Sequence, residues 1–134
     1  MNQPSYPMAP GQTRHVPPLS MFRRAGDFVF VSGCGAVNER GEFVSDDFEA
    51  QYRYTMEQLL DALKGAGCET KHVVSVRAYV QNPSDLPLHN ALYRDFFAAP
   101  LPARTTIVGC LPPGLLFEIE CVAYLGEDAG GITF

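Results

Sequence analysis

The chain has 134 residues, 46% of them hydrophobic, which is enough for one domain with one core and too little for two. Its formal net charge of -5 argues against general binding of polyanions such as nucleic acid. No apolar run is long enough to cross a bilayer, and the Pro-rich start lacks the features of a signal peptide. We therefore expect a cytoplasmic protein that does not associate with membranes.

Residues 1–18 are rich in proline and show little periodicity, which predicts an extended N-terminal arm. We expect the folded domain at 19–126, followed by a short C-terminal tail at 127–134. The domain opens with a strand at about 19–24, a hairpin turn at Ala25-Gly26-Asp27 and a second strand at 28–32. Gly33 and Gly35 are expected to end this second strand.

A helix is predicted next, because apolar residues recur at helical spacing from Phe48 to Leu63. Ser45-Asp46-Asp47 followed by Glu49 is typical of a helix start with a capping box. The glycines at 65 and 67 are expected to end this helix.

The second half of the chain predicts three strands and another helix. The β-branched run at 73–80 is a strand that Asn82-Pro83 ends. A second helix follows, capped by Ser84 or Asp85, and ends before Pro100. The last two strands lie at about 104–109 and 115–125, with a turn at 111–114 between them.

The order β-β-α-β-α-β-β predicts a single α+β domain with two helices on one face of a mixed sheet. The other face then has nothing from this chain to cover it. In the last strand one side is apolar, whereas the other mixes Glu118 and Glu120 with large apolar residues. An uncovered face of this kind usually marks an interface, so we expect self-association.

Cysteines and histidines are expected to be structural. The chain is too large and too apolar to need a disulfide framework, so free thiols are expected at Cys34, Cys68, Cys110 and Cys121. For Cys110 and Cys121 we expect core packing, because no histidine is placed to activate either thiol. The three histidines, His15, His72 and His89, share no ligand spacing, which argues against a metal site.

Two residues are candidates for chemistry. Arg104 starts a strand directly after a proline turn, and its planar guanidinium suits recognition of a small carboxylic acid; a surface or interface salt bridge is the alternative. Glu118 and Glu120 point to one strand face, where a partly desolvated carboxyl is able to act as an acid or base. The alternative for one of them is an ion pair between subunits, for example with Arg77.

A series of motifs in chain order resembles the RidA (YjgF/YER057c/UK114) family from about Leu19 to Leu125. The motifs are Val31-Ser32-Gly33, Gly65-Ala66-Gly67, Val80 before a loop, Asn90-x-x-Tyr93-x-x-Phe96-Phe97, Pro102-Ala103-Arg104-Thr105, Leu111-Pro112 and Glu118-Ile119-Glu120-x-x-Ala123. The resemblance implies a chorismate-mutase-like fold and a homotrimer whose sheets surround a central barrel, with three clefts between subunits. It also implies that Arg104 holds a substrate carboxylate, that Glu118 handles water or a proton, and that Ser32 and Gly33 line the cleft.

Departures from the family pattern concern the wall of the cleft. Leu19 stands where family members active on 2-aminoacrylate commonly have a tyrosine, and Thr106 stands where a cysteine is frequent. The sequence Cys34-Gly35-Ala36 replaces the usual Gln-Ile-Pro-like stretch. We therefore expect Leu19 and Thr106 to contribute to substrate binding with an altered preference.

The expected activity is hydrolysis of reactive enamine or imine acids to 2-oxo acids and ammonia, without a cofactor or metal. One alternative is a trimer that binds a small carboxylate without turnover. Another keeps the reaction for a larger dienamine acid such as 2-aminomuconate, which Leu19 favours. A ribonuclease role has been attached to some relatives, but the acidic balance of this chain argues against it.

Overall fold

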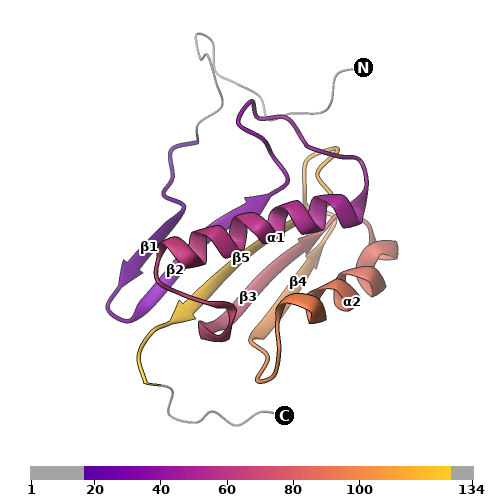
Figure 1. Ribbon diagram of the computed structural model, residues 1–134. Helices are drawn as coiled ribbons and strands as arrows, with labels where there is room; N and C mark the ends of the chain where they lie inside the picture. The colour runs from indigo at the N-terminus through magenta and orange to yellow at the C-terminus, as the bar shows by residue number, and fades with distance from the viewer. Residues whose placement is uncertain (1–16, 128–134) are drawn as a thin grey trace.

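The computed structural model describes residues 17–127 (Figure 1). The elements are β1 (Phe22–Ala25), β2 (Phe28–Gly35), α1 (Phe48–Gly65), η1 (Thr70–His72), β3 (Val73–Val80), η2 (Pro83–Asp85), α2 (Leu86–Phe96), β4 (Ala103–Val108) and β5 (Phe117–Tyr124). The predicted order of strands and α-helices is confirmed. The predicted arm at 1–18 and tail at 127–134 lie almost wholly outside the described residues. Within 17–127, no helix is long and apolar enough to cross a membrane.

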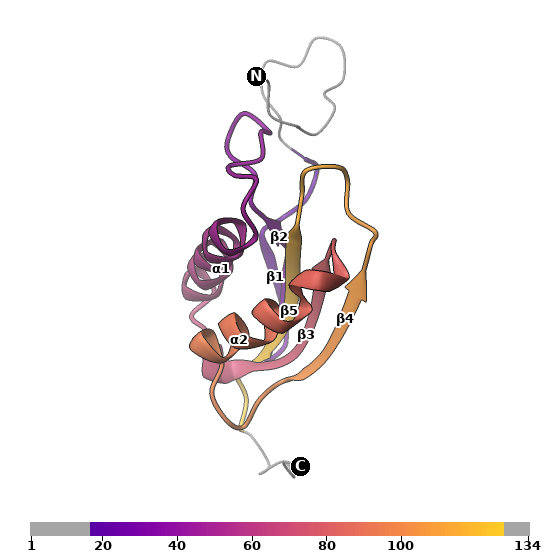
Figure 2. The ribbon, with the colours of Figure 1, turned by 90° about the vertical axis from the view of Figure 1, so that its right-hand side faces the viewer.

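The five strands form one sheet in the order β1-β2-β5-β3-β4. The β3–β4 pair is parallel and the other pairs are antiparallel, so the sheet is mixed as predicted. Figure 2 shows α1 and α2 on the same side of this sheet. The prediction of an α+β domain with both helices on one face is confirmed.

The core lies between the helices and the sheet. The apolar side of β5 is buried there, at Phe117, Ile119, Cys121 and Ala123. From the other side α1 contributes its buried stripe, which includes Tyr52, Met56, Leu59 and Leu63. Each large apolar side chain buried in this way stabilises the fold by about 1.5 to 3 kcal/mol.

The opposite face of the sheet is not covered by any described residue of this chain. Phe28 and Phe30 on β2 remain 44% and 48% exposed there, and Phe28 packs against Tyr124 at 4.9 Å between ring centroids. Glu118 and Glu120 lie on this open face, half-buried. The predicted mixed apolar and acidic face is therefore present.

The first two strands differ from the prediction in extent. β1 begins at Phe22 rather than near 19, because the backbone N–H of Leu19 donates locally to the Pro17 carbonyl instead of to a neighbouring strand. β2 does not end before Gly33 but continues to Gly35. A shift in register between Val31 and Cys34 accommodates the extra length.

The helix starts also differ from the prediction. Asp47 caps α1 by accepting a hydrogen bond from the Ala50 N–H at 2.9 Å. Glu49 does not complete a capping box; it pairs with Arg53 one turn along the helix at 3.1 Å. Asp85 precedes α2 without a capping hydrogen bond from its side chain, because residues 83–85 already form the 3-10 turn η2.

Gln51 connects the start of α1 to the segment before this helix and to the segment that leads into β5. It is fully buried, and its amide nitrogen donates to the carbonyls of Ser45 and Gly114 at 2.6 and 2.8 Å. Its amide oxygen accepts from the Leu116 N–H at 2.9 Å. These three bonds satisfy buried backbone groups and fix the residues that lead into β5.

We predict that Gln51→Ala destabilises the protein by about 2 to 4 kcal/mol, because it leaves buried donors and acceptors unpaired and opens a cavity. Gln51→Glu keeps the size but replaces the donating amide by an acceptor that faces two carbonyls. It is expected to destabilise at least as much at pH 7. Urea unfolding of both variants checks this, and a change below 0.5 kcal/mol in either would contradict the role of Gln51.

Candidate functional site

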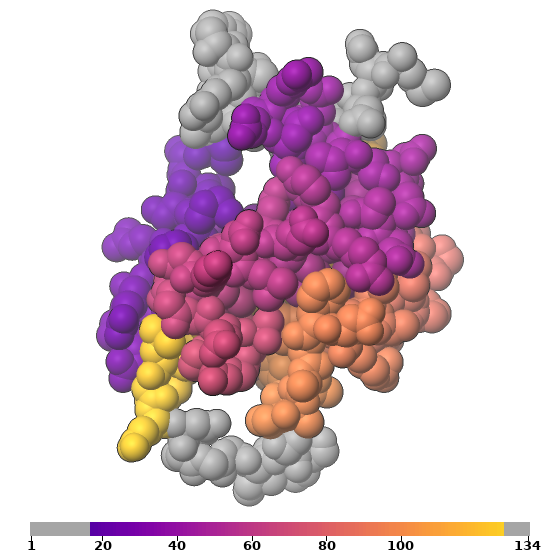
Figure 3. Space-filling view, in the orientation of Figure 1, coloured from indigo at the N-terminus to yellow at the C-terminus, as the bar shows by residue number. Residues whose placement is uncertain are grey.

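A hollow of about 440 Å³ lies beside Glu118, between the segment before β1, the end of β2 and α1. Figure 3 shows an opening between the indigo segment before β1 and the purple segment after β2. The hollow is lined by Pro17, Leu19, Met21, Gly33, Gly35, Val37, Asn38, Gln58 and Glu118. Three predicted site residues, Leu19, Gly33 and Glu118, are therefore brought together.

Gly33 is needed because the Glu118 carboxyl lies directly against its backbone. A Cβ atom at position 33 would lie 3.3 Å from both the Cδ and Oε2 atoms of Glu118. Gly35, the register partner of Glu118, would also bring a Cβ to 3.8 Å from its Oε1. Gly33 therefore leaves room for the acid between adjacent strands, whereas a Cβ at position 35 would make only ordinary contact with it.

Ser32 supports the hollow without lining it. Its hydroxyl donates to the Ser20 carbonyl at 2.5 Å, and its backbone N–H donates to the Met21 carbonyl at 2.9 Å. Both bonds hold the segment that carries Leu19 and Met21 against β2. In this chain alone the Ser32 side chain fixes the wall of the hollow rather than pointing into it.

The two carboxylates on the open face of β5 differ in their surroundings. Glu120 accepts a hydrogen bond from the Tyr79 hydroxyl and lies 3.9 Å from the Arg77 guanidinium. Glu118 makes no hydrogen bond or ion pair with another residue of the described range. Burial raises the pKa of the Glu118 carboxyl above its ordinary 4.5, and the negative charge of Glu120 adds to that effect.

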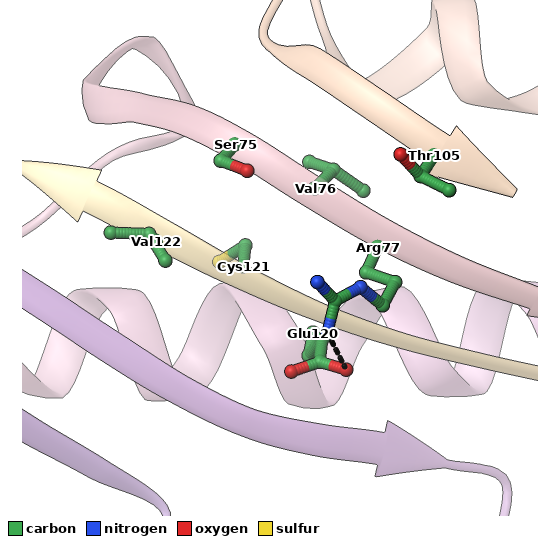
Figure 4. A pocket seen from close by; sticks show the side chains of 7 residues that line it. All are labelled: Ser75, Val76, Arg77, Thr105, Glu120, Cys121 and Val122. Atoms are coloured by element: carbon green, nitrogen blue, oxygen red, sulfur yellow. Dashed lines mark ion pairs between the residues drawn. The ribbon is translucent and has the colours of Figure 1, made fainter.

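A second hollow, of about 130 Å³, lies over the middle of the open face beside the Arg77–Glu120 pair (Figure 4). The predicted pairing of one glutamate with Arg77 is thus present, but within one chain rather than between subunits. It arises because Arg77 and Glu120 are register partners on neighbouring strands. The two charges already offset each other, so we do not place the functional site there.

Arg104 lies on β4 and is held by two residues of α2. Its guanidinium donates to the Asn90 side-chain oxygen at 2.7 Å and lies 4.7 Å from the centre of the Tyr93 ring. Asn90 and Tyr93 are three residues apart and therefore on one side of the helix. This cation–π contact and hydrogen bond orient the guanidinium while leaving it exposed and without an ion pair among the described residues.

Thr106 follows Arg104 on the same side of β4, since alternate residues of a strand share a face. Its hydroxyl is buried and has no hydrogen-bond partner in the described part of the chain. It does not line the hollow beside Glu118. Thr106 therefore belongs with Arg104, and Leu19 and Gly33 belong with Glu118.

The two groups of residues lie on opposite faces of the sheet. Glu118 is aligned with Tyr79 on β3, and Tyr79 with Ile107 on β4. Arg104 precedes Ile107 by three residues, which places it on the other face and roughly 10 Å further along the strand. Its contact with Tyr93 of α2 agrees with this placement. One chain therefore does not bring Arg104 and Glu118 together.

The buried thiols are poor nucleophiles. Burial raises the pKa of Cys34 to about 11, with a contribution from Glu118, and that of Cys121 to about 12. All four cysteines are free. Cys121 packs in the core as predicted, but Cys110 is exposed, because it lies after the end of β4 rather than within it.

His89 is fully buried beside Tyr52 and Tyr93, with ring centroids 5.8 and 5.9 Å away. Burial, with a contribution from the positive charge of Arg104, lowers its pKa to about 4. His89 is therefore neutral at pH 7 and adds no positive charge beside Arg104. His72 accepts a hydrogen bond from the Glu69 N–H at 2.9 Å, a structural role as predicted.

Sequence reasoning gave no role to Asn90, Tyr93, Met21 or Val37. The first two lie in a motif of the family resemblance, and their helical spacing is the signal that would have grouped them. Met21 and Val37 carry no such signal. Their position beside Glu118 depends on how the segments flanking the first two strands fold back.

The raised pKa of Glu118 predicts a stability effect that depends on pH. Above pH 4.5 the unfolded carboxyl loses its proton more readily than the folded one, so ionisation of Glu118 favours unfolding. Glu118→Gln is therefore expected to be more stable than the wild type at pH 7 and equal to it at pH 3. The gain should stay below about 1 kcal/mol, because the side chain keeps contact with water.

Thermal unfolding at both pH values measures this difference. Glu57→Gln on the exposed side of α1 is the matched control and should change stability little at either pH. A Glu118→Gln variant that is less stable than the wild type at pH 7 would show that the carboxylate is favourably held.

Comparison with known proteins identifies the family. The sequence profile of the endoribonuclease L-PSP family matches residues 13–125. The chain is 36% identical over 110 residues to Reactive Intermediate Deaminase A, chloroplastic, of Arabidopsis thaliana, which covers 81% of this chain and 59% of that protein. It is 30% identical over 100 residues to the human 2-iminobutanoate/2-iminopropanoate deaminase, with 73% of each chain covered.

Solved structures agree with the sequence comparison. The fold matches a RidA from an Antarctic Psychrobacter with a TM-score of 0.74 and 26% identity, covering 82% of this chain and 90% of that one. It matches a Rid-family protein from Yersinia pestis with a TM-score of 0.75 and 28% identity, at the same coverage. The chain therefore belongs to the endoribonuclease L-PSP family, also called the YjgF or RidA family.

Proposed function

We propose that the protein hydrolyses reactive enamine or imine acids to 2-oxo acids and ammonia, at clefts between the subunits of a homotrimer. The observation that carries the proposal is the placement of Arg104 and Glu118 on opposite faces of one sheet. A guanidinium and a partly desolvated carboxyl are able to meet only if different chains supply them. The uncovered face that holds Glu118 gives a second chain a surface to bind.

The proposed chemistry needs only orientation and one proton carrier. Arg104 of one subunit binds the substrate carboxylate through two charge-assisted hydrogen bonds. Glu118 of the next subunit positions a water molecule and accepts one of its protons as the water oxygen adds to the imine carbon. The carbon–nitrogen bond then breaks, and Glu118 returns a proton so that nitrogen leaves as ammonia.

The remaining predicted residues divide between the two sides of this cleft. Gly33 leaves space for the Glu118 carboxyl, Leu19 forms the wall beside it, and Ser32 holds that wall in place. Thr106 offers a hydroxyl next to Arg104. These assignments are proposals that agree with the placement of each residue in the chain.

Mixed oligomers test the division of the site between subunits. Arg104→Ala and Glu118→Gln should each lose most imine hydrolysis, by roughly 10²- to 10⁴-fold for Glu118→Gln. In oligomers co-assembled from equal amounts of both variants, one cleft in four receives both native residues, since half of the chains supply Arg104 and half supply Glu118. Activity should therefore return to about one quarter of the wild-type value.

Glu57→Gln, which alters an exposed carboxylate of α1 outside the hollow, is the matched control and should retain activity. The mass of each oligomer is measured by light scattering. No recovery in mixed oligomers of trimer mass would place both residues of the site in one chain. A monomer mass for the wild type at micromolar concentration would defeat the homotrimer.

A trimer that binds a small carboxylate without turnover is the main alternative. Both functions need Arg104 to bind the carboxylate, and turnover by the wild type distinguishes them. Arg104→Ala should weaken binding of a 2-oxo acid by about two orders of magnitude, because each charge-assisted hydrogen bond contributes about 1.5 to 3 kcal/mol. Arg104→Lys should restore binding only in part, since it lacks the planar two-pronged geometry. Calorimetry beside an imine assay checks this; binding without turnover in the wild type would favour the alternative.

A ribonuclease function has less support from this chain. None of the described residues that line the hollow beside Glu118 is a lysine or arginine, and the net charge of the chain is -5. RNA binding relies on cations that neutralise phosphates and on aromatic side chains that stack on bases. The described lining of the hollow provides neither.

A further inference from the structure

The hollow beside Glu118 has an apolar wall that the proposed chemistry does not use. Leu19, Met21 and Val37 form this wall, and Leu19 and Met21 remain 55% and 48% exposed. Apolar side chains that face an open hollow gain free energy when an apolar group displaces the water there. The volume of about 440 Å³ leaves room for a substituent beyond the reacting carbon.

The charge of the hollow restricts that substituent further. Among residues 17–127, Glu118 is the only charged residue that lines the hollow, and no lysine or arginine of this range does. A carboxylate entering this space would lose water and meet a like charge without a counter-charge. The raised pKa of Glu118 agrees with this, because it shows that the location disfavours negative charge.

The location of the wall determines which part of the substrate it would contact. In the proposed reaction Arg104 holds the carboxylate and Glu118 faces the imine carbon. The third substituent of that carbon is the side chain of the parent amino acid. It must point away from Arg104, and on the Glu118 side the space available is the hollow with the apolar wall.

We propose that Leu19, Met21 and Val37 form the subsite for this side chain and select uncharged aliphatic imine acids of about four side-chain carbons over small or acidic ones. The proposal rests on the proposed function. A subsite of this kind has room for the larger substrates that Leu19 favours. It disfavours 2-aminomuconate, because the second carboxylate of that compound would enter the hollow. Leu19 and Met21 are the determinants of specificity, and Glu118 remains the reacting group.

The test compares imines made in place by amino-acid oxidases from alanine, norleucine, glutamine and glutamate. Each methylene buried on the wall should raise kcat/KM about fourfold, so the norleucine imine should exceed the alanine imine by about 10- to 60-fold. The glutamate imine should be at least about tenfold slower than the glutamine imine, which differs from it mainly in charge.

Substitutions in the wall test whether its residues cause the preference for long, uncharged side chains. Met21→Ala and Leu19→Ala should each lower the ratio of norleucine to alanine kcat/KM by at least about threefold, since each removes three heavy atoms (Cγ and beyond) from the wall. Leu19→Lys should raise the ratio of glutamate to glutamine kcat/KM by supplying a cation. Leu88→Ala and Leu88→Lys, on exposed α2 and outside the hollow, are matched controls and should leave both ratios unchanged.

The outcomes separate this inference from the proposed function. If the wild type hydrolyses none of the four imines, the deaminase function itself fails. If it hydrolyses them without preference for norleucine, or prefers glutamate, the function stands and the subsite is wrong. If Leu19→Ala and Met21→Ala change the oligomer mass but neither ratio, the wall contacts a neighbouring subunit and the subsite is again wrong.

Discussion

The three hydrogen bonds of Gln51 are the interaction on which the placement of the acid depends. Two of them connect the first helix to the carbonyl of Gly114 and the N–H of Leu116, just before the last strand begins, and the third reaches the Ser45 carbonyl before the helix. The last strand lies between β2 and β3, so its register sets what each of its residues faces on both neighbours. A shift of one residue would turn Glu118 into the core and expose Phe117 instead. The buried amide therefore fixes the strand from which the acid reaches the open face.

Strand alternation then imposes a second constraint, because it separates the cation from the acid. Arg104 faces the helices and is held by Asn90 and Tyr93, whereas Glu118 faces the uncovered side of the same sheet. No rotation of side chains joins them through a sheet whose core is filled. Assembly is thus a chemical requirement of the proposed reaction as well as a means of covering Phe28 and Phe30. Changes on the open face are expected to affect catalysis and association together.

Much of this fold follows from local pattern, and what does not follow depends on contacts across the sheet. The helical spacing that ends at Leu63 and the β-branched run at 73–80 are local signals, and both predicted their elements. The continuation of β2 through Gly33 was missed, because the reason for that glycine is the Glu118 carboxyl on a strand far along the sequence. For the site, the residue types at 104 and 118 were indicated by chemistry and by family resemblance. That Arg104 and Glu118 lie on opposite faces of the sheet becomes clear only once the register of β3, β4 and β5 is known.

The contrast between Glu118 and Glu120 shows why residue type alone does not assign the acid. Both are carboxylates on one face of one strand, two residues apart. Tyr79 donates a hydrogen bond to Glu120, and Arg77 forms an ion pair with it, both from the neighbouring strand. Glu118 lies instead against two glycines and an apolar wall, where burial and the charge of Glu120 both favour its protonated form. The engaged glutamate thus contributes to the proton affinity of the other, and the environment built by the neighbouring strands makes Glu118 the residue able to exchange a proton.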